Sequence, residues 1–378
     1  MIAPDALWRA FEDAGVRFAT GVPDSLLKSF CACIEATVPA ERHVIAANEG
    51  CAIGLAAGWH LGRGGVPLVY LQNSGLGNVI NPLVSLADPG VYGLPMVVMI
   101  GWRGEPGVTD EPQHRRQGEI TPALLDALGT PWQVLTDEIE GAKAQVAGLV
   151  ATAVGRGGPV ALLVRKGAFS PFLRQGTPPS RVSDGLAMDR EAAIAVIVAA
   201  LAEEAASDGG ANVAVVATTG MASRELFELR VARGEPTADF YTVGSMGHAS
   251  SIALGLALAR PDRRVVLLDG DGALLMHLGA AASVAASAPA NLLHIVLDNA
   301  AHDSVGGQPT THPRLNFAAV ASALGYRDVG EADDEASLRA ALGGALQAIP
   351  GAIADAGQPR HPSAGGPTLL HVRIRRGA

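Results

Sequence analysis

Two stretches of the sequence, each at the end of an apolar run, carry oxygen atoms that could bind a divalent cation. Asp269-Gly270-Asp271-Gly272 follows Val265–Leu268, and Asp298-Asn299 follows a later apolar run. The glycines allow a tight turn that brings backbone amides close to an anion. Asp271 and Asn299 offer the hard oxygen ligands that Mg²⁺ or Ca²⁺ prefers, and a carbonyl just beyond Asn299 could be a third. For the Gly-Asp-Gly triplet alone, an ordinary turn is the alternative.

The elements that must position these residues alternate along the chain. Short, nearly all-apolar segments such as 95–101 alternate with helical periodicities such as 49–61. Such strands are typical of parallel sheets covered by helices on both faces. We therefore predict an α/β protein of two doubly wound parallel-sheet domains, at residues 1–170 and 190–378, with a linker at 171–189. Ligands of such sheets bind beyond the carboxyl ends of the strands.

Composition narrows the class of protein. Hydrophobic residues make up 48% of the chain and charged residues 17%, which is enough apolar material for two cores. A net charge of −9 offers no basic surface for nucleic acid but allows a locally basic site for a small anion. The three cysteines are too few for a disulfide framework and lack zinc-site spacing. With neither a signal peptide nor a membrane-length apolar run, we predict a cytoplasmic protein without membrane or nucleic-acid partners.

The Gly-Asp-Gly and Asp-Asn stretches together resemble the diphosphate- and metal-binding motif of thiamine-diphosphate-dependent enzymes. This resemblance implies thiamine diphosphate and Mg²⁺ as cofactors, with Asp271, Asn299 and the carbonyl of Ala301 as metal ligands. Asp298 stands where the motif usually has an Asn, and Ala273 where a hydroxyl residue is common. The resemblance leaves the diphosphate to backbone amides of the first stretch and to the loop 218–220. These residues are Gly270, Asp271, Gly272, Ala273, Thr219 and Gly220.

The same resemblance implies two further cofactor contacts. Glu49, between a predicted strand and a helix, would hydrogen-bond the aminopyrimidine ring, and burial would raise its pKa so that it shares a proton. Its alternative role is to complement a helix dipole. Met246 would be the apolar wedge that bends the cofactor, with the carbonyl of Gly244 accepting a bond from the amino group. Its alternative role is that of core filler.

Further stretches in both domains look like those of phosphonopyruvate decarboxylases, with sulfopyruvate decarboxylases as near relatives. They are residues 21–25, 70–78, 100–107, 110–114, 218–220, 223–226 and 306–310. The family implies conversion of 3-phosphonopyruvate to phosphonoacetaldehyde and CO₂ in the biosynthesis of phosphonate natural products such as antibiotics. It also implies a short form without a middle domain, and a homo-oligomer, at least a dimer, with active sites at the subunit interface.

A dianionic substrate needs charge-assisted hydrogen-bond donors. The sequence predicts a polar loop over 102–119, on which Gln113 and His114 are the first candidates for substrate contacts. His114 could also relay a proton near neutral pH. The other candidates are Ser25 as a catalytic and substrate-binding hydroxyl, Asn73 and Ser74 as neutral donors near the cofactor, and Lys166 and His302 as further substrate contacts. Each charged candidate could instead be a solvated surface group.

Three other functions remain to be weighed. Decarboxylation of 3-sulfopyruvate, or of another 2-oxo acid with carboligation, is the close alternative. A non-catalytic binding protein of this fold would be expected to lack Glu49, Asp271 or Asn299, and all three are present. A nicotinamide dehydrogenase is less favoured, because no Gly-x-Gly-x-x-Gly opens the first βα turn.

Overall fold

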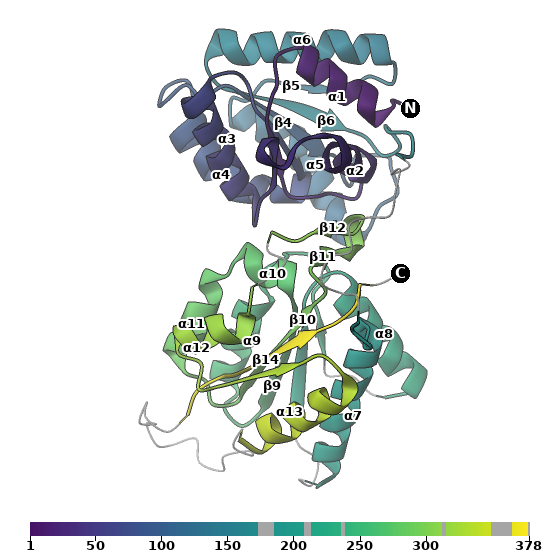
Figure 1. Ribbon diagram of the computed structural model, residues 1–378, viewed down its shortest axis with the longest axis vertical. Helices are drawn as coiled ribbons and strands as arrows, with labels where there is room; N and C mark the ends of the chain where they lie inside the picture. The colour runs from purple at the N-terminus through teal and green to yellow at the C-terminus, as the bar shows by residue number, and fades with distance from the viewer. Residues whose placement is uncertain (173–184, 208–212, 236–238, 312–314, 349–364, 377–378) are drawn as a thin grey trace. The chain divides into compact units, whose positions relative to one another are not determined.

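The computed structural model describes residues 1–172, 185–207, 213–235, 239–311, 315–348 and 365–376 (Figure 1). Its contacts divide the chain into two compact units. Unit 1 is Met1–Pro179 with Ser304–Thr311, and unit 2 is Ser180–Asp303 with His312–Ala378. Each unit contains a six-stranded sheet. The predicted domain boundaries stay a prediction, and residues 173–184 of the predicted linker lie outside the described residues.

Unit 1 has the strand order β2-β1-β3-β4-β6-β5, and all neighbouring strands run parallel. The strands are β1 (Ala19–Gly21), β2 (His43–Ile45), β3 (Leu68–Gln72), β4 (Met96–Gly101), β5 (Trp132–Val134) and β6 (Pro159–Val164). The helices are α1 (Pro4–Asp13), α2 (Lys28–Thr37), α3 (Glu49–Arg63), α4 (Leu76–Pro82), α5 (Pro112–Ala127) and α6 (Ile139–Arg156). Single turns are η1 (Ala40–Arg42), η2 (Asn73–Gly75) and η3 (Leu83–Ala87), and the returning segment carries β12 (Gln308–Pro309).

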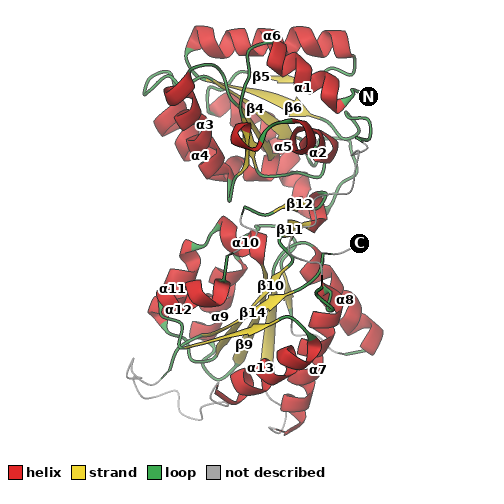
Figure 2. Cartoon of the chain, viewed as in Figure 1, coloured by secondary structure: helices red, strands yellow, loops and turns green. Residues whose placement is uncertain are grey.

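Alternation along the strands of unit 1 builds a core on each face of the sheet. In β3, Leu68 and Tyr70 join the cluster under α1, α2 and α6, whereas Val69 and Leu71 join the cluster under α3, α4 and α5. Successive side chains of a strand point to opposite faces, so a strand that is apolar throughout requires cover on both. Figure 2 shows helices on both faces of the sheet.

The predicted polar loop over 102–119 is wrong in its second half, because α5 begins at Pro112. Proline suits the first turn of a helix, where its missing N–H is not needed. The face of α5 that is buried consists of Gly118, Thr121 and Leu125, which have helical spacing but little apolar bulk. The hydrophobic pattern is therefore weak at this point of the sequence. Gln113 and His114 consequently lie on the first turn of a helix.

Unit 2 repeats the architecture with the strand order β13-β14-β10-β9-β7-β8, again with parallel neighbours. The strands are β7 (Val213–Ala217), β8 (Phe240–Tyr241), β9 (Arg264–Gly270), β10 (Leu292–Asp298), β13 (Asp328–Ala332) and β14 (Thr368–Arg373), with the short β11 (Ala301–His302). The turn η4 (Asp303–Val305) begins at the last residue of this segment of unit 2 and continues into the segment of unit 1. The helices are α7 (Arg190–Ser207), α8 (Met221–Arg233), α9 (Ala249–Ala259), α10 (Asp271–Met276), α11 (Gly279–Ser287), α12 (Phe317–Leu324) and α13 (Glu335–Ala348). Two doubly wound parallel sheets confirm the predicted fold class.

Two buried clusters again cover the two faces of the sheet in unit 2. One packs the sheet against α7, α8 and α13, and the other packs it against α9, α11 and α12. Periodicity did not predict α11, α12 or β13, since the two helices are short and alanine-rich and β13 is mostly exposed. Among the described residues, no helix is long and apolar enough to cross a membrane.

Candidate active site

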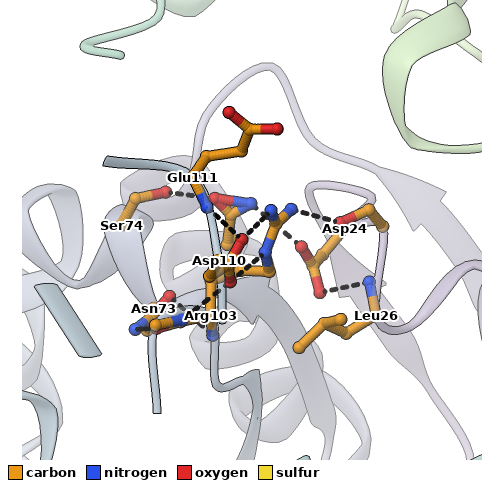
Figure 3. Close-up of polar contacts among 10 residues, drawn as sticks. Asp24, Leu26, Asn73, Ser74, Arg103, Asp110 and Glu111 are labelled. Carbon is orange, nitrogen blue, oxygen red and sulfur yellow. Dashed lines mark hydrogen bonds and ion pairs between the residues drawn. The ribbon is translucent and has the colours of Figure 1, made fainter. Parts of the chain in front are cut away.

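In unit 1, three neighbouring strands bring polar residues to one edge of the sheet. β1, β3 and β4 lie side by side, with Gly21 opposite Tyr70 and Gln72 opposite Gly101. Asp24 follows β1, and its Oδ1 accepts a hydrogen bond from Nε2 of Gln72 at 3.0 Å, while its Oδ2 accepts one from the Leu26 amide at 3.0 Å (Figure 3). A Cβ on Gly101 would lie 1.9 Å from Oδ2 of Asp24, so only glycine admits the carboxyl there.

Asp24 is fully buried, and its setting favours proton exchange. Burial raises its pKa from 3.8 to about 6, although the Leu26 amide and the positive charge of Arg103 act in the opposite direction. Removing a carboxyl from water disfavours its charged form, which is the larger effect here. Asp24 is not among the site residues that the sequence predicts. The available signal was its place directly after a buried strand, within the motif 21–25.

Arg103, which follows β4, is fixed in one orientation. Its Nε donates to Oδ2 of Asp110 at 2.7 Å, its Nη2 donates to Oδ1 of the same carboxylate, and its Nη1 donates to Oγ of Ser25 at 2.8 Å (Figure 3). These ionic hydrogen bonds hold the pKa of Asp110 well below its usual range. Because Oγ of Ser25 accepts from a cation, the proton of its hydroxyl remains to be donated elsewhere. The catalytic and substrate-binding role of Ser25 stays a prediction.

Asn73 and Ser74 have different surroundings. The buried amide of Asn73 donates to the carbonyl of Arg103 at 2.8 Å and to Oγ1 of Thr121 at 3.0 Å, and it accepts from the Arg103 amide at 3.2 Å. Its side chain therefore holds the turn at Arg103. Ser74 is exposed and donates to Oε1 of Gln72 at 2.9 Å, which links it to Asp24. Cofactor contacts for both residues stay a prediction.

Glu49 is the first residue of α3, and its carboxyl is buried with 5% of the residue exposed. Asn48 caps the helix by accepting from the Cys51 amide at 2.8 Å. Oε2 of Glu49 accepts from Nδ2 of Asn78 at 2.7 Å, and burial raises the pKa of Glu49 despite this bond. A Cβ on Gly75 would lie 2.5 Å from Oε1, so the glycine-rich loop lets the carboxyl approach. A buried carboxyl with neutral donors is what proton sharing requires.

The predicted substrate-binding residues lie in unlike settings. Burial lowers the pKa of half-buried His114, and the nearby positive charge of Arg103 lowers it further. Lys166 is exposed after β6, where the neighbouring Arg165 pairs with Glu105 at 2.7 Å. In unit 2, burial lowers the pKa of His302 to about 4, so at neutral pH it offers a neutral donor. Of these candidates, His114 is affected by the charge of Arg103, the residue that donates to Ser25.

In unit 2, the ends of β9 and β10 carry the predicted metal ligands. Leu297 lies opposite Gly270, so Asp271 and Asn299 follow neighbouring strand ends, and both are buried. The helix that begins at Asp271, α10, contacts β10 and β11. Oδ1 of Asn299 accepts from the amide of Ala301 at 3.0 Å, which closes the turn. Within the described ranges, no group of three or more His, Cys, Asp or Glu side chains forms a metal centre.

The donor set nevertheless fits Mg²⁺. The predicted ligands are one carboxylate, one amide oxygen and one carbonyl oxygen, all hard donors of the kind that Mg²⁺ prefers. Such a set contains a single carboxylate side chain, Asp271. Their role as ligands stays a prediction.

The loop 218–220, at the end of β7, has features that suit a bound phosphate. Oγ1 of Thr218 is buried with no hydrogen-bond partner in the described part of the chain. Such buried polar atoms are rare and call for an explanation, and a bound anion supplies one. Oγ of Ser223 donates to the carbonyl of Thr218 at 2.8 Å and fixes the loop. Thr219 is half-buried and Gly220 exposed, as contact with a ligand requires.

Met246 lies in the turn between β8 and α9 and is half-exposed. Ser245, next to it, has a φ of 54°, which makes the turn tight. Its role as a wedge, with the Gly244 carbonyl as an acceptor, stays a prediction.

Comparison with known families agrees with this fold. Residues 1–126 match the family described as "Thiamine pyrophosphate enzyme, N-terminal TPP binding domain". Residues 218–354 match "Thiamine pyrophosphate enzyme, C-terminal TPP binding domain". The fold and the matched families define a thiamine pyrophosphate enzyme.

Individual relatives narrow this class. The chain is 38% identical to a phosphonopyruvate decarboxylase of Streptomyces viridochromogenes, over all of this chain and 90% of the relative. It is 37% identical to one of Streptomyces hygroscopicus, over all of this chain and 89% of the relative. A sulfopyruvate decarboxylase of Methanosarcina acetivorans is 28% identical over 86% of this chain and 83% of its own length. The chain belongs to the phosphonopyruvate decarboxylase family, and it is a thiamine-diphosphate-dependent 2-oxo acid decarboxylase, a carbon–carbon lyase.

Proposed function

We propose that the enzyme decarboxylates 3-phosphonopyruvate to phosphonoacetaldehyde and CO₂, with Mg²⁺ as the metal, in the biosynthesis of phosphonate natural products. The observation that carries the proposal is the buried carboxyl of Glu49, held over Gly75 by Asn78 in a chain whose full-length relatives are phosphonopyruvate decarboxylases. Thiamine diphosphate, when bound, supplies an electron sink for the carboxylate's electron pair.

The residues of unit 1 then have distinct tasks. Glu49 holds or releases a proton at its carboxyl, because its raised pKa makes both forms accessible. Ser25 donates its hydroxyl proton to an anionic oxygen of the substrate, since Arg103 already occupies a lone pair of Oγ. His114 donates an N–H to the phosphonate, and the positive charge of Arg103 favours an anion nearby.

The residues of unit 2 would hold the cofactor. Asp271, Asn299 and the Ala301 carbonyl would bind Mg²⁺, and the loop 218–220 would bind the diphosphate. Asp271→Ala should abolish the rise in thermal stability on adding thiamine diphosphate with Mg²⁺, because the metal would lose its carboxylate ligand. An undiminished rise would contradict this assignment.

A substrate comparison tests the proposed activity. Purified enzyme is given 3-phosphonopyruvate or 3-sulfopyruvate, with and without thiamine diphosphate and Mg²⁺, and aldehyde formation is measured. We expect the phosphonate to be the better substrate and omission of either cofactor to stop turnover. A preference for the sulfonate would favour the second candidate, sulfopyruvate decarboxylation, which the Methanosarcina acetivorans relative suggests.

We also propose a homo-oligomer, at least a dimer, in which one cofactor meets Glu49 of one chain and Asp271 of another. Glu49 belongs to unit 1 and Asp271 to unit 2. Inactive Glu49→Gln and Asp271→Ala chains, mixed under conditions that allow subunit exchange, should regain activity. Failure to do so despite demonstrated exchange would contradict a shared site.

The free cysteines Cys31, Cys33 and Cys51 suit a reducing compartment, and we propose the cytoplasm.

A further inference from the structure

A buried ionic cluster in unit 2 has no part in the function proposed above. Arg190, the first residue of α7, forms a bidentate ion pair with Glu225: Nε donates to Oε2 and Nη2 donates to Oε1, each at 2.8 Å. Its Nη1 donates to Oδ2 of Asp303 at 3.0 Å. The exposed fractions of the three side chains are 13%, 7% and 14%, in that order. Desolvation offsets most of the Coulomb energy of buried pairs, so their chief consequence here is geometric.

The cluster reaches the predicted metal ligand Asn299 through Asp303. Nδ2 of Asn299 donates to Oδ2 of Asp303 at 2.6 Å. An amide that donates to a carboxylate has only one good orientation, because the reverse would bring two oxygens together. Oδ1 of Asn299 is therefore directed away from Asp303 and accepts from the Ala301 amide. This oxygen keeps a second lone pair for a cation.

On its other side, the cluster reaches the loop 218–220. Glu225 lies on the first turns of α8, which begins directly after that loop. Oγ of Ser223, on the same turn, donates to the carbonyls of Ala217 at 3.1 Å and Thr218 at 2.8 Å. Arg190 thus connects α8, which follows the loop 218–220, to Asp303, which accepts a hydrogen bond from Asn299. Two residues of the motif 223–226, Ser223 and Glu225, make these contacts.

We propose that Asp303, held by Arg190, is a positioning residue that orients the amide of Asn299 for Mg²⁺ and couples the metal loop to the loop 218–220. The inference rests on the proposed function, in which Asn299 is a metal ligand. Partners that orient a metal ligand typically contribute about 10- to 100-fold to metal affinity. We expect a loss of that size when the acceptor at Asp303 is removed.

The test measures Mg²⁺ binding rather than turnover. Full-length protein with saturating thiamine diphosphate is titrated with Mg²⁺, and half-saturation is followed by calorimetry. Asp303→Ala should raise the half-saturating concentration about 10- to 100-fold, whereas Asp303→Asn, which keeps an acceptor for Asn299, should raise it less. Glu204→Ala is the control, since it removes a different arginine's partner in the same unit: Arg264 donates to Glu204 at 2.7 Å. The control should leave Mg²⁺ affinity unchanged even where it lowers the melting temperature.

Three outcomes would overturn the inference. If both Asp303 variants bind Mg²⁺ as the wild type does, Asp303 positions nothing, whatever happens to stability. If Glu204→Ala weakens Mg²⁺ binding as much as Asp303→Ala, the effect is general destabilisation. A wild-type protein that binds no Mg²⁺ with thiamine diphosphate would instead refute the proposed function, and the inference with it. If the alanine variant does not fold, Asp303→Asn alone decides the test: a half-saturating Mg²⁺ concentration equal to that of the wild type overturns the inference.

Discussion

Each unit contains an arginine held by carboxylates, but the two clusters differ in their partners. Arg190 of unit 2 donates directly to two carboxylates, Glu225 and Asp303. Arg103 of unit 1 donates to one, Asp110, and the buried carboxyl of Asp24 beside it accepts only from neutral N–H groups in the contacts described above. Glu49 in unit 1 likewise accepts from an amide. In unit 1, burial raises the pKa of Asp24 and of Glu49, whose hydrogen-bond partners are neutral, whereas in unit 2 Glu225 and Asp303 are held by ionic contacts with Arg190.

The largest effect on activity is expected when the carboxyl proton of Glu49 in unit 1 is removed from the reaction. Glu49→Gln keeps the size of the side chain and its contact with Asn78 but cannot share a proton, so kcat should fall at least about 100-fold. Melting temperature and cofactor binding should change little. Glu119→Gln, an exposed glutamate of the same unit, is the control and should keep wild-type activity. A Glu49→Gln enzyme with more than a tenth of wild-type activity would mean that Glu49 is misassigned.

The substrate contact proposed for unit 1 comes next in size. A hydrogen bond to a charged group contributes about 1.5–3 kcal/mol, so His114→Ala should lower kcat/KM for 3-phosphonopyruvate roughly ten- to a hundredfold. Pyruvate, which lacks the phosphonate, should lose much less. Equal losses for both substrates would place His114 in the common decarboxylation machinery. No loss for either would move the phosphonate site to Lys166 or His302.

Asp24 provides a stability test of proton exchange in unit 1. Its pKa in the folded protein, about 6, lies above the unfolded value of 3.8, so the folded state binds more protons between pH 4 and 6. Its contribution to stability is present below pH 4 and is lost as the pH rises through 6. Relative to Asp24→Asn, the wild type should lose about 2–3 kcal/mol of unfolding free energy between pH 4 and 7.

Denaturant titrations at several pH values measure this difference. Arg103 and Asp110 are the charged neighbours present in both proteins, so their own titration cancels in the comparison. Unfolding free energies that run parallel with pH in the two proteins would show that Asp24 has an ordinary pKa.

The smallest effect is expected at the end of β6. Arg165 is half-exposed and pairs with Glu105, and exposed pairs contribute about 0–1 kcal/mol. Arg165→Ala should therefore change the unfolding free energy by less than about 1 kcal/mol. Its kcat/KM for 3-phosphonopyruvate should stay at the wild-type value. A tenfold fall in kcat/KM would mean that Arg165 also contributes to binding the phosphonate, so that His114 would not be the main contact.

The hydrophobic pattern of neighbouring residues was sufficient to predict the fold class and which residues lie at the strand ends. Strands β4 and β6 are apolar throughout, and their continuous burial matches the pattern that predicted them. Glu49 follows the strand β2 and opens α3, as predicted. α5 was missed because its buried face carries Gly118 and Thr121 in place of large apolar residues.

Side-chain periodicity and nearby turn residues were enough to predict two doubly wound sheets and the places where the chain leaves each strand. Which of those places come into contact depends on how the whole chain folds. Ser25 follows β1 and Arg103 follows β4, and these two strands flank β3, so the two residues reach the same edge of the sheet and form a hydrogen bond. Arg190 donates to Asp303 although more than a hundred positions separate them in the sequence. Partners this distant depend on strand order and on the packing of helices over the sheet, and these arise from the summed burial of the whole core. No local pattern contains that information.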